Sequence, residues 1–571
     1  MSSDPEKETK PPLDSASSST LPVISDRETL HDKDAKETRK NSDHTETSVT
    51  VKSEGDGEDK SGKKEEGEGK DGTGDKEDKE DEANPKAELE KPGLLVTPGL
   101  LSVIEVCKEK VETIAKECRA SNTKYRDLEF DMLNEAHMCL YSVNWSGIGK
   151  FPSDKQRVTE VFESPTFFKS DDGTPSSDDI HQGALGDCWF LCALATISNL
   201  PHLVQQVCVA KDEEVGVYGF IFYRDDGWVS VIIDDMLFTN APKWEELTKE
   251  EKDLYHDKDQ FNKISRKGGK ILTFAKSGAH GETWVPLIEK AYAKFYGCYN
   301  HLQGGFPREA IEDLTGGVAT LFLTTDILDR DAFWNDQLLK ANKDRLFSCY
   351  FWGLNNPDGG DARVQGLVGS HAYSVLRAVE CNGKRFVVVR NPWGESEWTG
   401  PWADGSKQWE GEWLKVLPLL GHSFGDDGQF VMEYDDFLTC FTHMDRTLLF
   451  DSGWTAASKW LQVPLQPGPI SWSYGDLSYV VTVPAATRAV FVLSQLNSRF
   501  FDAIERGYRF NLDFSVVKEG ESKPFTRSSQ AMPFCRRVTV EADLQPGKYF
   551  VYVSMPQGKG FAEIALIVYA L

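Results

Sequence analysis

The fold of this chain is decided by residues 182–191, whose sequence is Gln182-Gly183-Ala184-Leu185-Gly186-Asp187-Cys188-Trp189-Phe190-Leu191. The two glycines favour a loop, and the apolar run that continues to Ile197 predicts a buried helix. Cys188 then stands at the start of that helix, where the helix dipole and the free backbone N–H groups favour a thiolate. The segment is typical of a nucleophilic cysteine, although a cysteine in such a position is more often only a buried small side chain.

Gln182 lies in the same loop, a few residues before the cysteine. Its side-chain amide can turn back towards the start of the predicted helix. There it would join the backbone N–H of Cys188 as a second donor to an oxyanion. We therefore expect these two groups to form an oxyanion hole.

A thiol nucleophile also needs a base and a group that orients the base. His371 stands at the entry of a predicted strand, and Asn391 follows the β-rich run Phe386–Arg390. Adjacent strands would bring Asn391 against the imidazole, and Trp393 would shield that contact from water. A cysteine with a distant His–Asn pair is the arrangement of papain-like peptidases.

Three blocks of sequence around these residues closely resemble the active-site blocks of calpains. They are residues 182–191, 369–375 and 390–400. Three further segments, residues 227–235, 287–294 and 312–317, resemble calpain protease-core sequences. The resemblance covers about residues 120 to 450 and extends less sharply to residue 571.

The resemblance implies an α+β fold, in which a two-lobed papain-like calpain protease core is followed by an antiparallel β-sandwich. The expected parts are a tail (1–95), a helical segment that packs on the core (96–150), a first lobe with Cys188 (151–330), a second lobe with His371 and Asn391 (331–450), and the sandwich (451–571). The tail contains no aromatic residue and is rich in Lys, Glu, Asp, Ser and Gly. Such a composition cannot bury enough apolar surface to offset chain entropy, so we expect disorder.

Calpains bind one calcium ion in each lobe, and the resemblance implies acidic ligands in this chain. Asp179 and Glu282 match the first-lobe ligands, with backbone oxygens expected from residues 171–173, where the loop carries one extra residue. The second-lobe ligands are matched by Glu397, Asp404 and Asp427. Gln429 stands where the family commonly has a further glutamate, which should weaken the second site because calcium affinity depends on ligand charge.

The resemblance implies a calcium-dependent intracellular cysteine endopeptidase that performs limited proteolysis of protein substrates. A catalytically silent calpain-like scaffold is the main alternative, and the complete set of Cys188, His371, Asn391 and Gln182 argues against it. A transglutaminase would carry an aspartate where this chain has Asn391. Conventional calpains end in EF-hand domains, and no EF-hand loop follows residue 451. This chain therefore resembles an atypical calpain, and no EF-hand small subunit is implied.

The composition indicates which kinds of partner the chain can bind and in which cellular compartment we expect it. Acidic residues outnumber basic ones by 91 to 64, which argues against nucleic-acid binding. The eleven scattered cysteines, the polar start of the chain and the lack of a long apolar run predict a cytoplasmic protein with free thiols. The sequence leaves membrane association of the C-terminal region open.

Overall fold

The computed structural model describes residues 46–50, 93–141, 152–169, 173–225, 227–353, 363–464, 474–501, 510–528, 535–554 and 561–571. Most of the predicted tail lies outside these ranges. Within it, Glu46–Thr50 form strand β1, which pairs in parallel with β18 (Tyr474–Val483).

A buried helix, α5 (Cys188–Ile197), lies at the centre of the first core. Its side chains are apolar on all sides, as expected of a helix that is fully buried. Helices α9 (Trp284–Tyr296) and α10 (Pro307–Thr315) pack against it. The rings of Phe190 and Tyr292 stack with centroids 4.1 Å apart, which ties α5 to α9. This packing fixes the position of the first residue of α5, Cys188.

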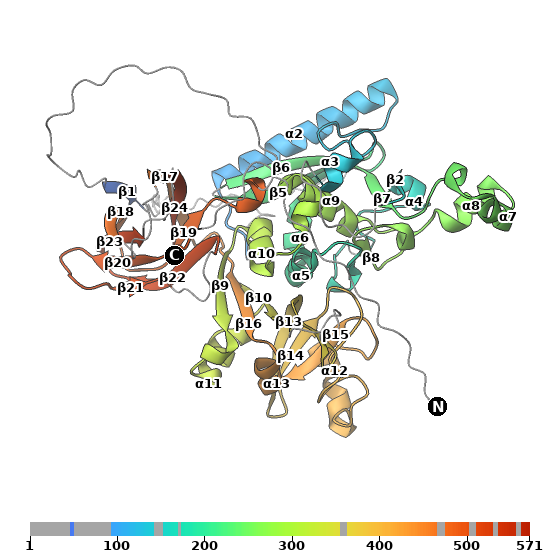
Figure 1. Cartoon of the computed structure of the whole chain (residues 1–571). Helices are drawn as coiled ribbons and strands as arrows, with labels where there is room; N and C mark the ends of the chain where they lie inside the picture. Colours follow the sequence, from blue (N-terminus) through green and yellow to red (C-terminus); the bar gives the residue numbers. More distant parts are fainter. Residues whose placement is uncertain are drawn as a thin grey trace, which may run out of the picture. The chain divides into compact units, whose positions relative to one another are not determined.

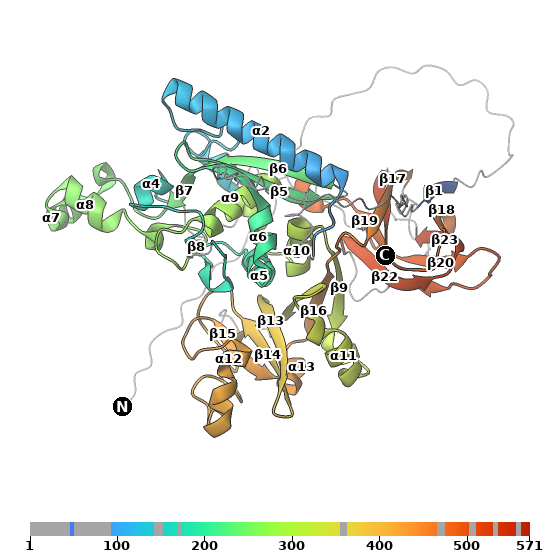
Figure 2. The same ribbon diagram turned by 180° about the vertical axis from the view of Figure 1, so that it is seen from behind.

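A three-stranded antiparallel sheet adjoins this core and is formed by β4 (Cys208–Asp212), β5 (Val217–Arg224) and β6 (Gly227–Asp234). The expected helical segment contains α2 (Pro98–Ser121), and Figures 1 and 2 show this helix lying along β5 and β6. Its buried side chains recur every three or four residues, and they pack against Val217 and Ile221.

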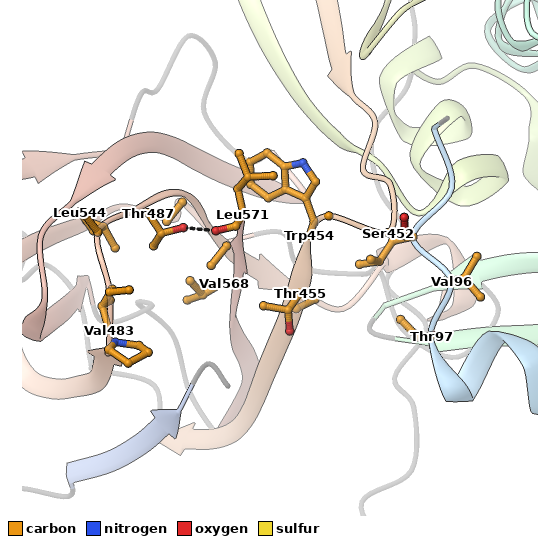
Figure 3. Close-up of a pocket in the computed structure, with 18 of the residues that line it drawn as sticks. Val96, Thr97, Ser452, Trp454, Thr455, Val483, Thr487, Leu544, Val568 and Leu571 are labelled. Atoms are coloured by element: carbon orange, nitrogen blue, oxygen red, sulfur yellow. Dashed lines mark hydrogen bonds between the residues drawn. The ribbon is translucent and has the colours of Figure 1, made fainter. Parts of the chain in front are cut away.

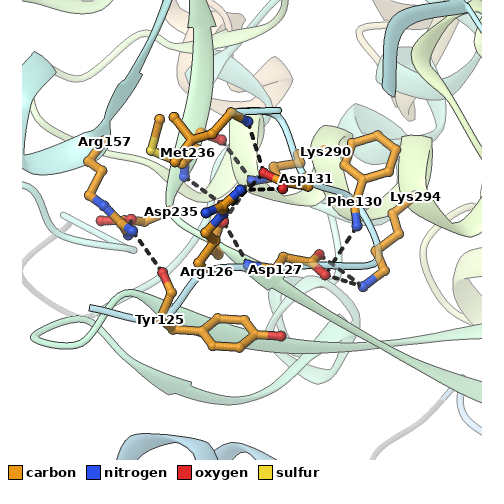
Figure 4. A network of polar contacts seen from close by, with 12 residues as sticks. Tyr125, Arg126, Asp127, Phe130, Asp131, Arg157, Asp235, Met236, Lys290 and Lys294 are labelled. Carbon is orange, nitrogen blue, oxygen red and sulfur yellow. Dashed lines mark hydrogen bonds and ion pairs between the residues drawn. The ribbon is translucent and has the colours of Figure 1, made fainter. Parts of the chain in front are cut away.

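The segment that follows α2 is fastened to the core by buried ion pairs (Figure 4). Lys294 of α9 binds Asp127 with its Nζ 2.9 Å from Oδ1, and Lys290 binds Asp234 at 2.5 Å. The backbone N–H of Asp127 also donates to Asp234 at 2.9 Å. Each buried charge is therefore paired, as burial in a low dielectric requires.

A second, six-stranded antiparallel sheet carries the other predicted catalytic residues. Its strands, in spatial order, are β15 (Gln429–Glu433), β14 (Lys384–Arg390), β13 (His371–Cys381), β10 (Arg345–Phe351), β16 (His443–Leu448) and β9 (Val318–Leu323). Hydrophobic clusters cover both faces, one with Trp334 and Phe437, the other with Trp402 and Trp409. The sheet thus begins at Val318, before the expected lobe boundary near residue 331.

Residues 455–570 contribute two further sheets. One has the order β17 (Thr455–Pro464), β24 (Phe561–Ala570), β19 (Thr487–Gln495) and β22 (Arg537–Leu544). The other has the order β1, β18, β23 (Gly547–Ser554), β20 (Phe514–Lys518) and β21 (Thr526–Arg527). Tyr479 and Val551 of the second sheet share one hydrophobic cluster with Phe491 and Leu566 of the first.

Shorter elements complete the described chain. The strand pairs are β2 (Asp154–Arg157) with β7 (Met236–Thr239), β3 (Ile180–His181) with β8 (Lys276–Ser277), and β11 (Arg363–Val364) with β12 (Leu367–Val368). The remaining α-helices in the described ranges are α3 (Ala136–Tyr141), α4 (Val158–Val161), α6 (Pro201–Val207), α7 (Lys249–Tyr255), α8 (Lys258–Ser265), α11 (Arg330–Asp336), α12 (Leu417–Leu420) and α13 (Tyr434–Cys440). Among the described helices, none combines the length and apolar character that crossing a membrane needs.

Candidate active site

The loop before Cys188 is held close to the backbone of a neighbouring segment. The N–H of Ala184 donates to the carbonyl of Thr273 at 2.9 Å. A Cβ added at Gly183 would lie 2.1 Å from the carbonyl oxygen of Phe274, so only glycine fits this approach. Glycine at position 183 therefore lets the loop pass close to Phe274 and lead into Cys188, the first residue of α5.

Strand β13 runs beside α5 and brings His371 to the level of the cysteine. The hydroxyl of Ser374 donates to the carbonyl oxygen of Cys192 at 2.8 Å, one helical turn beyond Cys188. At the start of the strand, a backbone hydrogen bond from Ala372 reaches the Cys188 thiol. The residue next to His371 thus contacts the predicted nucleophile directly.

His371 and Asn391 are hydrogen-bonded to each other at the ends of two paired strands. The imidazole Nε2 lies 2.7 Å from Oδ1 of Asn391. The Asn391 amide N–H groups donate to the carbonyls of Glu395 and Ser396 at 2.9 and 3.0 Å. These bonds fix which end of the amide faces the ring, so Nε2 of His371 carries the proton and Nδ1 has the lone pair of a base.

Trp393 covers this pair. Its ring centroid lies 4.5 Å from that of His371, and its backbone N–H donates to Oδ1 of Asn391 at 3.1 Å. The Asn391 side chain is fully buried and His371 is 5% exposed. The His–Asn hydrogen bond is therefore shielded from water, which strengthens it.

The electrostatics of Cys188 differ from the expectation of a thiolate. Burial raises the pKa of the thiol to about 11, and the neighbouring Asp187 carboxyl raises this pKa as well. Backbone N–H groups of Ala372, Trp189 and Cys188 lower the pKa, but by less than burial raises it. In this arrangement the thiol is neutral at pH 7, and a base must take its proton when it attacks.

Gln182 lies between the loop that leads to Cys188 and the loop that carries Asn391. Its backbone N–H donates to the carbonyl of Pro392 at 3.1 Å, which places it against the loop that carries Asn391. Its side-chain Nε2 donates to the carbonyl of Leu185 at 2.7 Å. One amide hydrogen is thus used within the loop, and the second remains for the predicted oxyanion hole.

Two buried carboxyl groups beneath the nucleophile are not among the predicted functional residues. Asp187 is fully buried at the start of α5, and Glu289 of α9 is 1% exposed. Burial raises the pKa of Asp187 to about 7, and it raises the pKa of Glu289 well above its usual value. The two carboxyl groups interact with each other, and burial favours the neutral form of each. The motif contains Asp187, but its distant partner could not be read from the sequence.

The first predicted calcium-ligand set is brought together. Burial raises the pKa of Glu282 to about 7, and the nearby Asp179 carboxylate contributes to this rise. Oε1 of Glu282 accepts the N–H of Lys169 at 3.0 Å, whereas Oε2 is buried and has no hydrogen-bond partner. A buried carboxylate oxygen beside a second carboxylate suits a cation. Residues 171 and 172 of the expected backbone ligands lie outside the described residues.

In the second predicted set of calcium ligands, a carboxylate already has other hydrogen-bond partners. Glu397 has a pKa of about 7, raised by burial and then by Asp404 and Asp427. However, Asp404 already accepts hydrogen bonds from His422 at 2.7 Å and from the N–H of Gly425 at 2.8 Å. The neighbouring amide of Gln429 donates to the carbonyl of Gly421 at 2.9 Å. Within the described ranges, no three acidic, histidine or cysteine side chains are arranged around a metal position.

A cavity in the C-terminal region is lined by none of the residues of the candidate active site (Figure 3). It has a volume of about 630 Å³ and is lined by residues 95–98, 452–456, 483–487, 489, 544, 568, 570 and 571. Its lining includes no cysteine, histidine or acidic residue. It therefore contains neither a thiol nucleophile nor a base that could activate one.

A cysteine at the start of a buried helix, beside a strand that opens with an asparagine-bonded histidine, is the arrangement of a cysteine protease. Comparison with known proteins agrees with this class. The family model described as "Calpain family cysteine protease" matches residues 148–447, so the chain belongs to the calpain family.

Relatives with this name are found in several animals. A calpain of Schistosoma mansoni is 35% identical over 360 residues, which are 60% of this chain and 42% of that protein. Calpain-9 of Rattus norvegicus is 33% identical over 58% of this chain and 44% of its own length. The human calpain-2 catalytic subunit is 31% identical over 60% and 45%. The matches thus span less than half the length of these relatives.

One solved structure, the cysteine protease and lectin-like domains of a surface layer associated protein of Clostridium difficile, aligns with 78% of this chain and 87% of that chain. Its TM-score is 0.19 at 10% identity, too low to support an argument about the fold.

Proposed function

We propose that this chain is a calcium-dependent cysteine endopeptidase that performs limited proteolysis of proteins with Cys188, His371 and Asn391. The supporting observation is the buried hydrogen bond between His371 and Asn391, held under Trp393 beside the backbone that contacts the Cys188 thiol. We further propose that the core around α5 and the six-stranded sheet with its hydrophobic clusters are the two lobes of a papain-like protease. We also propose that residues 455–570 form a β-sandwich.

In the proposed acylation step, the Cys188 Sγ attacks the peptide carbonyl carbon while its proton moves to Nδ1 of His371. The oxyanion of the tetrahedral intermediate accepts hydrogen bonds from the Cys188 N–H and from the second amide hydrogen of Gln182. His371 then gives its proton to the leaving nitrogen, the C–N bond breaks and a thioester forms. Asn391 holds the imidazole through this transfer and stabilises its protonated form.

Deacylation uses the same groups in reverse. His371 takes a proton from water, and the hydroxide formed attacks the thioester carbonyl. The C–S bond breaks, and the proton returns to the Cys188 sulfur. The high pKa of the resting thiol fits this scheme, because the proton must move to His371 as the sulfur attacks rather than before it.

Asp179 and Glu282 would hold one calcium ion. Bound calcium supplies the positive charge that lets these neighbouring carboxylates ionise together. Glu397, Asp404 and Asp427 are proposed as a second, weaker site, because Asp404 is bonded to His422 and Gln429 adds no charge. No disulfide is assigned to any of the eleven cysteines, which supports a reducing compartment such as the cytoplasm.

Casein cleavage tests the proposal. The purified chain should cleave casein in calcium and stop when the calcium is chelated. Cys188→Ala should abolish cleavage, and Cys440→Ala, which changes a thiol on α13, should not. Cleavage that survives Cys188→Ala would reject the assigned nucleophile, and cleavage that ignores chelation would reject the calcium sites.

A further inference from the structure

A short segment of the C-terminal region lies against α9 and against Trp189 in the first turn of α5. It follows β19 and consists of Asn497 and the 3-10 helix η8 (Ser498–Phe501). The ring of Phe500 stacks on Tyr296 of α9, with centroids 4.9 Å apart and planes 20° apart. The Asn497 amide donates to the Tyr296 hydroxyl at 2.9 Å. This segment is therefore part of the packed protein rather than a free connection.

Arg499 makes the contacts that matter for the site. Its guanidinium donates to the carbonyl of His301 at 2.7 Å and to that of Gly304 at 2.6 Å. It also lies over the ring of Trp189, with Cζ 4.5 Å from the centroid. One side chain from residue 499 thus binds both a core loop and the residue that follows Cys188.

The loop that Arg499 binds, residues 301–305, holds the nucleophile loop in turn. The N–H of Gly304 donates to the carbonyl of Gly186 at 2.9 Å, and the indole N–H of Trp189 donates to the carbonyl of Leu302 at 2.8 Å. A Cβ at Gly305 would lie 2.5 Å from the Trp189 ring and 2.6 Å from the Arg499 guanidinium. These contacts leave little room for the loop to move while Arg499 is in place.

A second arginine fastens the same C-terminal region to the helix that follows this loop. Arg536 donates to Asp313 of α10 at 2.7 Å and to the carbonyl of Glu309 at 3.1 Å. Both partners are buried. The C-terminal region therefore grips the stretch 301–315 at both ends, and the Arg499 end is the one that reaches Trp189.

We propose that Arg499 is a positioning residue for the peptidase reaction: it clamps loop 301–305 and Trp189, and so fixes the backbone N–H of Cys188 in the oxyanion hole. The inference rests on the proposed function. It makes the C-terminal sheets part of the catalytic unit, because the protease core alone lacks this guanidinium.

The effect should have a specific signature. Stabilising a tetrahedral oxyanion depends on the position of the Cys188 N–H, whereas alkylation of the thiol by iodoacetamide forms no oxyanion. Arg499→Ala should therefore lower kcat and weaken binding of a peptide aldehyde, each by about tenfold, because small misplacements of a catalytic group have effects of this size. KM and the iodoacetamide rate at Cys188 should change less than about twofold.

The test compares the full chain with Arg499→Ala, Arg499→Lys and Arg488→Ala. Arg488 lies on the preceding strand, β19, but binds Glu541 and not the core loop. We expect partial rescue by lysine, which keeps the charge but cannot bind both carbonyls in a fixed plane, and no effect of Arg488→Ala. An equal loss in Arg499→Ala and Arg488→Ala, or unchanged aldehyde binding in Arg499→Ala, would overturn the proposal.

Hydrogen exchange makes the test independent of peptidase activity. Backbone amides of residues 186–190 and 301–305 should exchange faster in Arg499→Ala than in the wild-type chain, while those of β5 should not. Unchanged exchange in both segments would reject the clamp, even if the wild-type chain proved inactive. A wild-type chain that cleaves no casein would instead count against the proposed function, so the two failures can be told apart.

Discussion

Asn391 has every hydrogen-bonding position of its side chain occupied. Its oxygen accepts from His371 and from the Trp393 N–H, and its amide donates to two backbone carbonyls. The amide cannot rotate without losing these bonds inside a buried site, where an unmade hydrogen bond costs about 1–3 kcal/mol. The imidazole orientation is therefore set by Asn391.

Replacing Asn391 should slow catalysis without preventing folding. We expect Asn391→Ala to lower kcat by about 100-fold and to leave KM within about twofold, since the loss concerns the orientation and charge of His371 and not substrate binding. Steady-state kinetics on a fluorogenic peptide measure this. A variant with unchanged kcat would show that Asn391 does not orient the base.

The pKa of Cys188 predicts a particular dependence on pH. Because burial raises this pKa to about 11, the thiolate fraction increases about tenfold per pH unit below that value. The rate of iodoacetamide alkylation at Cys188, followed by peptide mass spectrometry, should therefore keep rising from about pH 6 to about pH 10. A plateau near pH 7 would mean instead that the thiolate is already formed at neutral pH.

The identity of the candidate catalytic residues could be predicted from the sequence, but their electrostatics could not. The motif around Cys188 and the flanks of His371 and Asn391 are distinctive. The neutral state of the thiol depends on its burial in the folded chain, which the local motif does not reveal. The bond between His422 and Asp404 also depends on tertiary packing, so no local pattern indicates that a predicted ligand already has a partner.

At the scale of elements, the clearest constraint is the contact between α2 and β5. A Cβ at Gly219 of β5 would lie 2.6 Å from the sulfur of Cys107 and 2.9 Å from Val111, both on α2. The helix can lie this close to the sheet only because the strand has a glycine at the crossing. The elements themselves follow from periodicity, but the crossing point does not.

Substituting Gly219 should separate α2 from the sheet. We expect Gly219→Ala to lower the free energy of unfolding by about 1–3 kcal/mol, the usual result of overpacking. Gly227→Ala is the control, because an added Cβ there has no atom within 4 Å. Thermal unfolding should show a lower Tm for the first variant alone, and equal Tm values would contradict the packing described.

Boundaries of elements are harder to predict than their existence. The hairpin of β5 and β6 lies where two runs rich in β-branched and aromatic residues flank the predicted turn at residues 225–227, and helix α9 covers the apolar stretch from Val285 to Phe295. Strand β20 begins only at Phe514, although the residues before it are also rich in aromatic and β-branched side chains; the backbone N–H of Phe510 is instead bonded by the Gln495 side chain. Pairing partners that lie far apart in the sequence decide such ends.

At the scale of the whole molecule, the acidic sets on the two sides of the site differ. Glu282 has an oxygen without a partner beside Asp179, whereas Asp404 is bonded to His422 and Gly425. The first set is thus better suited to take up a cation. If both proposed sites bind calcium, the first should therefore bind it more tightly than the second.

Calcium binding at the first set should depend on pH. The pKa of Glu282 is raised to about 7, so this carboxyl is largely protonated at pH 6 and ionised at pH 8. Protons compete with the ion, and calcium affinity measured by titration calorimetry should rise across that interval. Glu282→Gln should weaken binding at pH 8 at least about tenfold and remove this pH dependence, and a variant that binds calcium normally would exclude Glu282 as a ligand.

Acyl-enzyme formation with a peptidyl p-nitrophenyl ester tests most directly whether Cys188 is the nucleophile. Acylation by such an ester is fast, so the thioester should accumulate before it is hydrolysed. We predict a burst of about one nitrophenol per chain, with the acyl group on Cys188 alone when the quenched protein is mapped by mass spectrometry. A burst that persists in Cys188→Ala, or an acyl group on any other residue, would contradict this assignment.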